Sequence, residues 1–325
     1  MRHTSLAILA GGCNSAIARV ATCALIALAS MPAFAKGPRD VADTPLDLCS
    51  RTPDSNEEVR VSQTMLAGVP ALLRIPRTVT KPPIVLWHGF GPPASESALM
   101  AALPLDDVPA IKVYLGLPLF GARAPEGGNA ELARLQQADF AMRLFRPAVV
   151  GAADELPSVV AALKRAGCMS RSDAIALFGF SAGGASALIA LEQHHVPVRS
   201  VVVLNASTGL SASVAALERA THQPYSWTPQ SRALAQRTDA VHRAAEIAHG
   251  SRPPALLIVQ GAGDETLTDQ PAIELHDALA PYYRGARSEN RLKLDVIADV
   301  AHNWAADPSS AAMLGKRVAQ WYLQN

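Results

Sequence analysis

The sequence predicts an α/β fold: a mostly parallel, doubly wound sheet, opened by an antiparallel hairpin and covered by helices on both faces. Three observations lead to this prediction. Short apolar segments alternate with helical patterns, the middle apolar segments show no polar alternation, and a two-residue turn separates the first two strands. Strands that are apolar throughout are typical of a parallel sheet buried on both faces. Strand–helix alternation is typical of doubly wound sheets.

The predicted elements follow in chain order. Residues 59–65 and 69–75 flank the turn Ala67-Gly68 and form the hairpin. The other predicted strands are residues 84–87, 111–115, 174–178, 201–204, 256–259 and 292–297. The predicted helices are residues 95–103, 131–143, 152–165, 182–193, 229–249, 271–279 and 308–324.

Residues 59–325 contain no internal repeat and no linker, so we expect a single domain there, preceded by a polar, proline-rich lead-in at 36–58. Two connections are long, at 116–156 and 207–254. Loops at the carboxyl ends of the strands line the site in such sheets. Each connection is therefore either a wall of the site or an ordinary crossover, and residues 207–254 are a candidate small lid insertion.

Residues 1–35 have the features of a signal peptide. They combine a basic start, an apolar run at 20–30 and a small-x-small pattern that ends at Ala35. The apolar run is too short for a membrane anchor, and neither Cys13 nor Cys23 follows a clean lipobox. The sequence therefore predicts cleavage after Ala35 and a periplasmic or secreted protein.

Composition excludes some classes of partner. The 325-residue chain is 49% hydrophobic and 18% charged, with a formal net charge of +1 spread along its length. We therefore expect no nucleic-acid partner and, beyond the signal segment, no stable membrane span. Removal of the signal segment leaves Cys49 and Cys168, which form either one disulfide or two buried free thiols. The sequence does not fix the oligomeric state.

The segment Gly179-Phe180-Ser181-Ala182-Gly183 carries the clearest chemical signal. It joins an apolar strand to an alanine-rich helical pattern, and G-x-S-x-G at such a turn is typical of a nucleophile elbow. In so tight a turn a side chain at 179 or 183 would clash. The alternative is a structural glycine-rich turn in some other α/β protein.

A nucleophilic serine needs a general base, and the base needs an orienting acid. The chain order for an elbow serine is Ser, then Asp or Glu, then His. Asp264 and His302 follow later predicted strands in that order, so we predict that they act with Ser181. Other acids near these positions are Glu265, Asp269 and Asp299, of which Asp299 is badly placed to reach the imidazole.

The oxyanion of the tetrahedral intermediate needs fixed N–H donors. His88-Gly89-Phe90-Gly91 directly follows the strand at 84–87, so the backbone N–H groups of Phe90 and Ala182 are the predicted donors. His88 is predicted to brace the loop. The candidate substrate-binding residues are Trp304, Phe180 and Trp227.

Together these motifs make the chain resemble the α/β-hydrolase superfamily over residues 59–325. The elbow is similar to that of the dienelactone-hydrolase-like and prolyl-oligopeptidase-like serine esterases and peptidases. A dienelactone hydrolase proper has a cysteine nucleophile, whereas position 181 is serine, so the resemblance favours ester or peptide substrates over lactones. It implies an α/β-hydrolase fold, no cofactor and no metal.

The sequence therefore predicts an exported serine hydrolase that cleaves a small-molecule or polymeric carboxylic ester through an acyl-enzyme intermediate. A small serine peptidase or an acyltransferase on the same fold is the alternative. A peptidase that captures a free amine needs an acidic side chain, for which Glu126 and Glu131 are candidates. A non-catalytic binding protein is the third hypothesis.

Overall fold

The computed structural model describes residues 48–49, 58–170 and 173–325. The predicted signal segment and nearly all of the lead-in lie outside the described residues. The strands are β1 (Val59–Leu66), β2 (Val69–Pro76), β3 (Ile84–Trp87), β4 (Lys112–Leu115), β5 (Ile175–Phe180), β6 (Val198–Leu204), β7 (Ala255–Gly263) and β8 (Leu292–Ala301).

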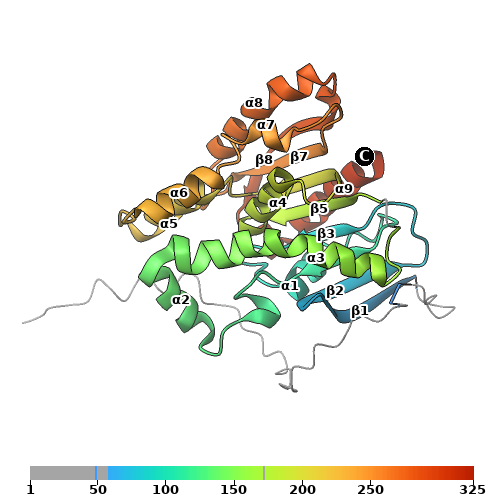
Figure 1. Cartoon of the computed structure of the whole chain (residues 1–325), viewed down its shortest axis with the longest axis horizontal. Coiled ribbons are helices and arrows are strands. Elements are labelled where there is room, and N and C mark those ends of the chain that lie inside the picture. The colour runs from blue at the N-terminus through green and yellow to red at the C-terminus, as the bar shows by residue number, and fades with distance from the viewer. Residues whose placement is uncertain (1–47, 50–57, 171–172) are drawn as a thin grey trace, which may run out of the picture. The chain divides into compact units, whose positions relative to one another are not determined.

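Within the described residues these strands form a single eight-stranded sheet in the order β1-β2-β4-β3-β5-β6-β7-β8 (Figure 1). The pairs β1–β2 and β2–β4 are antiparallel, and every pair from β4 to β8 is parallel. The predicted α/β fold with an opening hairpin is therefore confirmed.

The hairpin depends on its two-residue turn. Leu66 pairs with Val69, and the residues between them, Ala67 and Gly68, have φ values of 51° and 83°. Two successive residues at positive φ are the requirement of a type I′ turn, whose twist matches that of the flanking strands.

The helices pack on the two faces of the sheet, and Figure 1 shows α3 and α4 lying across one of them. The longer helices are α1 (Glu96–Ala102), α2 (Gly128–Asp139), η2 (Phe140–Val150), α3 (Gly151–Arg165), α4 (Ala182–Gln193), α5 (Leu210–Thr221), α6 (Pro229–Arg237), α7 (Ala244–Ile247), α8 (Gln270–Gly285) and α9 (Pro308–Gln324). Short 3₁₀ turns are η1 (Gly121–Arg123), η3 (Glu289–Arg291) and η4 (Trp304–Ala306).

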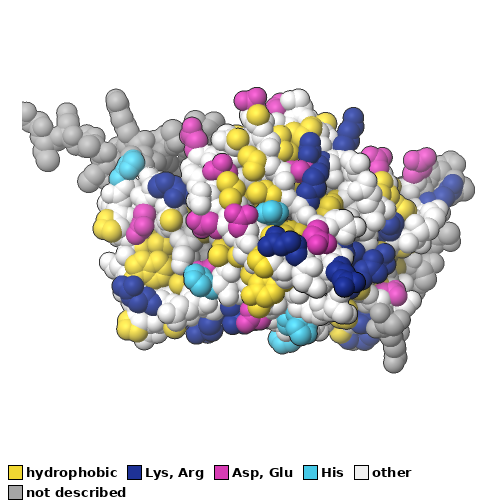
Figure 2. All heavy atoms as spheres, turned by 90° about the horizontal axis from the view of Figure 1, so that it is seen from above, with side chains coloured by type: hydrophobic (Ala, Val, Ile, Leu, Met, Phe, Trp, Pro, Cys, Tyr) yellow, Lys and Arg dark blue, Asp and Glu magenta, His cyan; other side chains and the backbone are white. Residues whose placement is uncertain are grey.

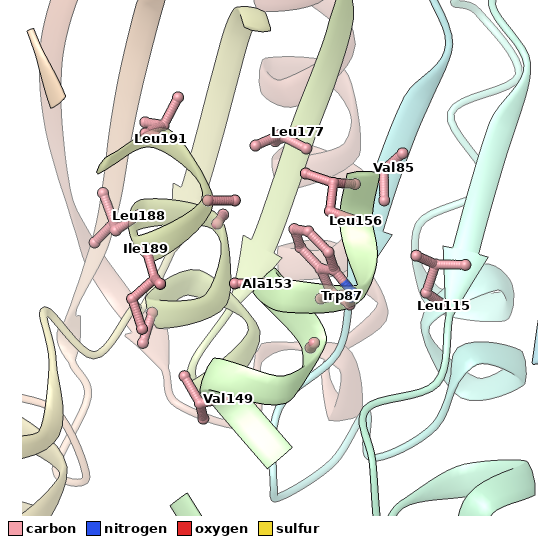
Figure 3. Close-up of a cluster of buried hydrophobic side chains, with 14 of the residues drawn as sticks. Val85, Trp87, Leu115, Val149, Ala153, Leu156, Leu177, Leu188, Ile189 and Leu191 are labelled. Atoms are coloured by element: carbon pink, nitrogen blue, oxygen red, sulfur yellow. The ribbon is translucent and has the colours of Figure 1, made fainter. Parts of the chain in front are cut away.

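The central strands contribute to two hydrophobic cores because successive side chains point to opposite faces. Along β3, Val85 and Trp87 face the core beneath α3 and α4, whereas Ile84 and Leu86 face the core beneath α1 and α9. Figure 3 shows Trp87 in the first core, with side chains of α3 and α4 around it. The apolar strands of the sequence are thus explained by burial on both faces.

Two predicted helices are broken in the structure, and the helix expected at 271–279 continues to Gly285 as α8. The helix expected at 131–143 breaks at Asp139, whose φ is −172°. The wide π-helical segment η2 follows and includes Pro147, which has no N–H to donate to the preceding turn.

The helix expected at 229–249 is two helices, α6 and α7. The Thr238 hydroxyl donates back to the Leu234 carbonyl, and the Asp239 carboxylate accepts from the Val241 N–H, which turns the chain. Helix α5 was not predicted.

Cys49 and Cys168 form a disulfide, which decides between the two alternatives for these thiols. The two residues are 119 positions apart. In the chain-entropy account, a cross-link over a loop of that length stabilises the folded state by roughly 5 kcal/mol. The bond ties the lead-in to the turn after α3, at the opposite end of β5 from Ser181.

Acidic and basic side chains are interspersed on the face of the molecule in Figure 2, which fits the balanced charge of the sequence. Within the ranges that the structure describes, none of the helices has both the length and the apolar character needed to cross a bilayer.

Candidate active site

Ser181 occupies a strained turn between β5 and α4, at φ 53° and ψ −117°. This conformation is rarely adopted by residues with a side chain. The turn is closely packed: a Cβ atom at Gly183 would lie 2.5 Å from the His88 carbonyl oxygen, and one at Gly179 would overlap the backbone of residues 183 and 184. The predicted need for glycine at both positions is confirmed.

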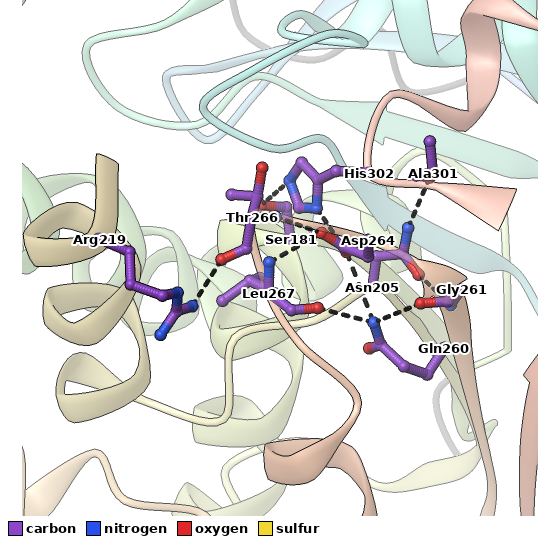
Figure 4. Close-up of polar contacts among 10 residues, drawn as sticks. All are labelled: Ser181, Asn205, Arg219, Gln260, Gly261, Asp264, Thr266, Leu267, Ala301 and His302. Carbon is purple, nitrogen blue, oxygen red and sulfur yellow. Dashed lines mark hydrogen bonds and ion pairs between the residues drawn. The ribbon is translucent and has the colours of Figure 1, made fainter. Parts of the chain in front are cut away.

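The structure brings Ser181, His302 and Asp264 into one hydrogen-bonded chain (Figure 4). His302 Nε2 lies 3.1 Å from Ser181 Oγ, and His302 Nδ1 lies 2.7 Å from Asp264 Oδ2. Because a carboxylate only accepts hydrogen bonds, Nδ1 carries the proton, and Nε2 is left to accept from the serine hydroxyl. This arrangement allows Nε2 to act as a general base.

The carboxylate of Asp264 is fully buried, whereas the His302 side chain is 15% exposed. Asp264 Oδ1 accepts from the backbone N–H groups of Thr266 and Leu267, at 2.8 and 2.7 Å. Buried Gln260 braces the same loop by donating to the Leu267 carbonyl at 2.8 Å. These fixed donors hold the carboxylate toward the imidazole.

The loop after β3 lies directly against the elbow. A Cβ atom at Gly89 would lie 2.8 Å from Ser181 Cβ, so the loop comes this close only because residue 89 is glycine. Phe90 follows in this loop, and its ring stacks on that of Phe120, with centroids 4.8 Å apart. Ala182 is the first residue of α4, where an N–H has no partner within the helix. Gly89 and Ala182 thus lie beside Ser181, and the role of the Phe90 and Ala182 N–H groups as oxyanion donors stays a prediction.

His88 is completely buried and braces the two loops that follow β3 and β4. Its Nδ1 lies 2.7 Å from the Gly89 carbonyl oxygen, and its Nε2 accepts from the Leu117 N–H at 3.1 Å. Because Nε2 can accept only in the neutral imidazole, the ring proton lies on Nδ1 and is donated to the Gly89 carbonyl. Burial lowers the pKa of His88 to about 4.

Two of the three predicted substrate-binding residues lie in the core instead. Phe180 is 0% exposed and Trp304 is 1% exposed. The Phe180 ring packs between His302 and Trp304, with centroid distances of 5.1 and 5.9 Å. Phe180 therefore packs against the imidazole, Trp304 packs against Phe180, and neither side chain offers a surface to a substrate. The sequence does not separate these two roles, because an aromatic residue beside a catalytic position suits either.

The third, Trp227, is half-buried in the 207–254 segment, where its ring packs edge-to-face against Tyr225. The Tyr225 hydroxyl donates to Asp139 at 2.6 Å, which ties the segment to the start of η2. Arg219 on α5 donates to the Thr266 carbonyl at 2.8 Å, so the segment also touches the loop of Asp264 (Figure 4). A role for Trp227 in substrate binding, and a lid role for the segment, stay predictions.

The other acidic candidates lie elsewhere. Glu265, Asp269 and Asp299 are exposed, and His302 Nδ1 faces Asp264. Glu131 forms an ion pair with Arg134 at 2.6 Å, so this carboxylate already has a cationic partner. In the part of the chain that the structure describes, no cluster of three His, Cys, Asp or Glu side chains is arranged to hold a metal ion.

Sequence reasoning missed two buried polar residues near the site, Gln260 and Asn205. Each lies at the carboxyl end of a buried strand, where a lone polar residue after an apolar run is the available signal. The partners of Asn205, however, are backbone groups on β7 and β8. Gln260 donates to the Leu267 carbonyl in the loop after its own strand. No motif specifies either set of partners.

A comparison with protein families gives a match over the C-terminal part of the chain. The model of the prolyl oligopeptidase family matches residues 149–325, which include all three members of the hydrogen-bonded chain. No curated protein sequence matches the chain.

Solved structures share the fold at low sequence identity. TT1662 from Thermus thermophilus is 21% identical with a TM-score of 0.60, over 82% of this chain and 99% of that one. Carboxyl esterase 2 from Tuber melanosporum is 15% identical with a TM-score of 0.54, over 85% and 89% of the two chains. Dipeptidyl peptidase 4 from Porphyromonas gingivalis is 15% identical with a TM-score of 0.56, over 82% of this chain but only 35% of that one.

The close packing at the elbow predicts that Gly183→Ala lowers the free energy of unfolding by about 2 kcal/mol, because the new methyl group meets backbone oxygens that cannot move aside. Gly91→Ala is the matched control, since a Cβ there has no described heavy atom within 4 Å; its change should stay within about 0.5 kcal/mol. Urea denaturation measures both. Equal stabilities of the two variants would contradict the packing argument.

Buried, neutral His88 predicts a specific acid sensitivity. Its pKa is about 4 in the folded state against 6.5 in the unfolded chain, so between these values the unfolded chain binds more protons. The free energy of unfolding should therefore fall as the pH drops from about 6.5 to about 4, by about 3 kcal/mol. His88→Gln removes this contribution, and its unfolding free energy, measured across the same range, should fall less steeply. Parallel curves would exclude a buried neutral imidazole.

Proposed function

The chain belongs to the prolyl oligopeptidase family, and from that premise we propose that it is an exported enzyme that cleaves carboxylic esters through an acyl-enzyme intermediate. It is a serine hydrolase of the α/β-hydrolase type. The ester substrate, the individual roles of the residues and the export are our proposal. The chain of contacts from Ser181 through His302 to Asp264, at 3.1 and 2.7 Å, carries it.

In the proposed reaction, Ser181 Oγ attacks the ester carbonyl while His302 Nε2 takes the hydroxyl proton. Asp264 holds the imidazole in the required tautomer and stabilises its positive charge. The N–H groups of Phe90 and Ala182 donate to the oxyanion of the tetrahedral intermediate.

The imidazolium then gives its proton to the leaving alkoxide, so the alcohol departs and the acyl group stays on the serine oxygen. In the second half of the reaction, His302 takes a proton from water, and the hydroxide attacks the acyl-enzyme. Collapse of this second intermediate releases the carboxylic acid and returns the proton to Ser181. No cofactor has a step in this scheme.

A small serine peptidase is the second candidate, because the family description and the similarity to a dipeptidyl peptidase point toward peptide bonds. A peptidase would need a carboxylate, from Glu126 or Glu131, to bind the amine of its substrate. The ion pair of Glu131 with Arg134 favours an ester substrate, since this carboxylate already has a cationic partner. An acyltransferase would use the same acyl-enzyme, with an alcohol or amine in place of water.

Export is supported by the disulfide between Cys49 and Cys168, because such bonds persist in oxidising compartments. The periplasm or the medium is the proposed location. We expect intact-mass analysis of the exported protein to give a chain that begins at Lys36 with one disulfide. A full-length chain in the cytoplasmic fraction would contradict export.

The proposed activity predicts hydrolysis of p-nitrophenyl esters by the wild type. In the Ser181→Ala variant, kcat should fall on the order of 10⁴-fold, because the nucleophile is lost. The measurement compares an ester series from acetate to palmitate with p-nitroanilide peptides, for both proteins.

Faster turnover of anilides than of esters would contradict the esterase proposal and identify the protein as a peptidase. Equal ester hydrolysis by the wild type and the variant would show that Ser181 is not the nucleophile.

A further inference from the structure

Asn205 lies among the strand ends that carry the three predicted catalytic residues. It directly follows β6, which lies between β5, the strand before Ser181, and β7, which leads to Asp264. The side chain is 0% exposed, and the backbone has a φ of 43°. Asparagine tolerates this left-handed conformation better than most residues.

The amide of Asn205 joins the loops of the acid and the base. Its Oδ1 accepts from the Gly261 N–H at 2.7 Å, and its Nδ2 donates to the Ala301 carbonyl at 3.0 Å. Gly261 lies near the end of β7, three residues before Asp264, and Ala301 directly precedes His302. Figure 4 shows the amide between these two backbone groups, close to the three predicted catalytic side chains.

The same segment also holds the elbow. The Ser181 N–H donates to the Leu204 carbonyl at 3.1 Å, and the Ser207 N–H donates to the Ser181 carbonyl at 3.1 Å. The backbone on either side of Asn205 thus fixes the position of the serine, while its side chain fixes the other two loops.

The pairing of β7 with β8 is irregular where these two strands approach the site. The pairing of β7 with β8 is regular up to Gly261, and its register then shifts before Gly263 pairs with Ala301. A bulge of this kind leaves backbone groups without ladder partners. The Asn205 amide binds one backbone donor and one backbone acceptor on the two sides of this irregularity, and only a side chain with both functions can do so.

We propose that Asn205 is a positioning residue that sets the distance from the Asp264–His302 pair to Ser181. The inference rests on the proposed function, because it concerns the geometry of that same hydrogen-bonded chain. Asn205 touches no reacting atom, so its effect is on the alignment of the base.

The test uses the full chain with two substitutions. Asn205→Gly removes both side-chain bonds and keeps a residue that accepts positive φ. Asn205→Asp keeps the acceptor, loses the donor, and adds a negative charge beside the loops of Asp264 and His302. Arg287→Gly is the matched control, since exposed Arg287 has a φ of 50° and precedes β8, at the end of the strand opposite His302.

For Asn205→Gly, kcat per folded enzyme should fall about 10- to 100-fold, as expected for a misplaced base, with KM nearly unchanged. For Asn205→Asp, the acid limb of the pH–rate profile should also move to higher pH, because the added charge favours protonated His302. A loss of folded protein alone lowers the amplitude of a profile without moving its midpoint. The control should match the wild type in both measurements.

Fluorophosphonate labelling of Ser181, with Ser181→Ala as the blank, separates this inference from the proposed function. If the wild type is not labelled and does not hydrolyse esters, both the proposed function and the role of Asn205 are overturned. If the wild type does both and the folded Asn205 variants match it in kcat and pH profile, the Asn205 role alone is overturned. Should Asn205→Gly not fold, the pH profile of Asn205→Asp decides.

Discussion

The tight turn at Ser181 is the constraint on which the rest of the site depends. The serine has a positive φ, residues 179 and 183 are glycine, and the His88 carbonyl packs against Gly183. The backbone of the turn therefore has no space in which to move. The serine hydroxyl is therefore held at the carboxyl edge of the sheet, and the first N–H of α4 is presented beside it. Strain of this kind persists only where the surrounding structure determines it fully, and here the two flanking strands and the loop after β3 do so.

Parallel pairing explains how residues far apart in the sequence meet at that turn. The strands β5 to β8 all end at the same edge, so Ser181, Asp264 and His302 follow strand ends on one side of the sheet. Three strand spacings of about 4.8 Å separate β5 from β8, so the loop of His302 has to reach back across the ends of β7 and β6. Asn205 lies on that route.

Much of this arrangement is predictable from the sequence, because buried parallel strands and a nucleophile elbow have local signatures. The eight strands were predicted within a few residues, and so was the helix after the elbow. The helix break at Asp139 and the turn at Asp239 depend on side-chain-to-backbone bonds that compete with a helical pattern. The burial of Phe180 and Trp304 depends on packing between distant elements, and so does the role of Asn205, which no local pattern encodes.

The central claim is that Asp264 and His302 activate Ser181 for covalent chemistry. Its most direct test is mass spectrometry of the protein after incubation with a fluorophosphonate, for the wild type and for His302→Ala. We expect one adduct on the peptide that contains Ser181 in the wild type, and a much slower formation of that adduct in the variant. An adduct on another residue, or equal labelling rates in both proteins, would contradict it.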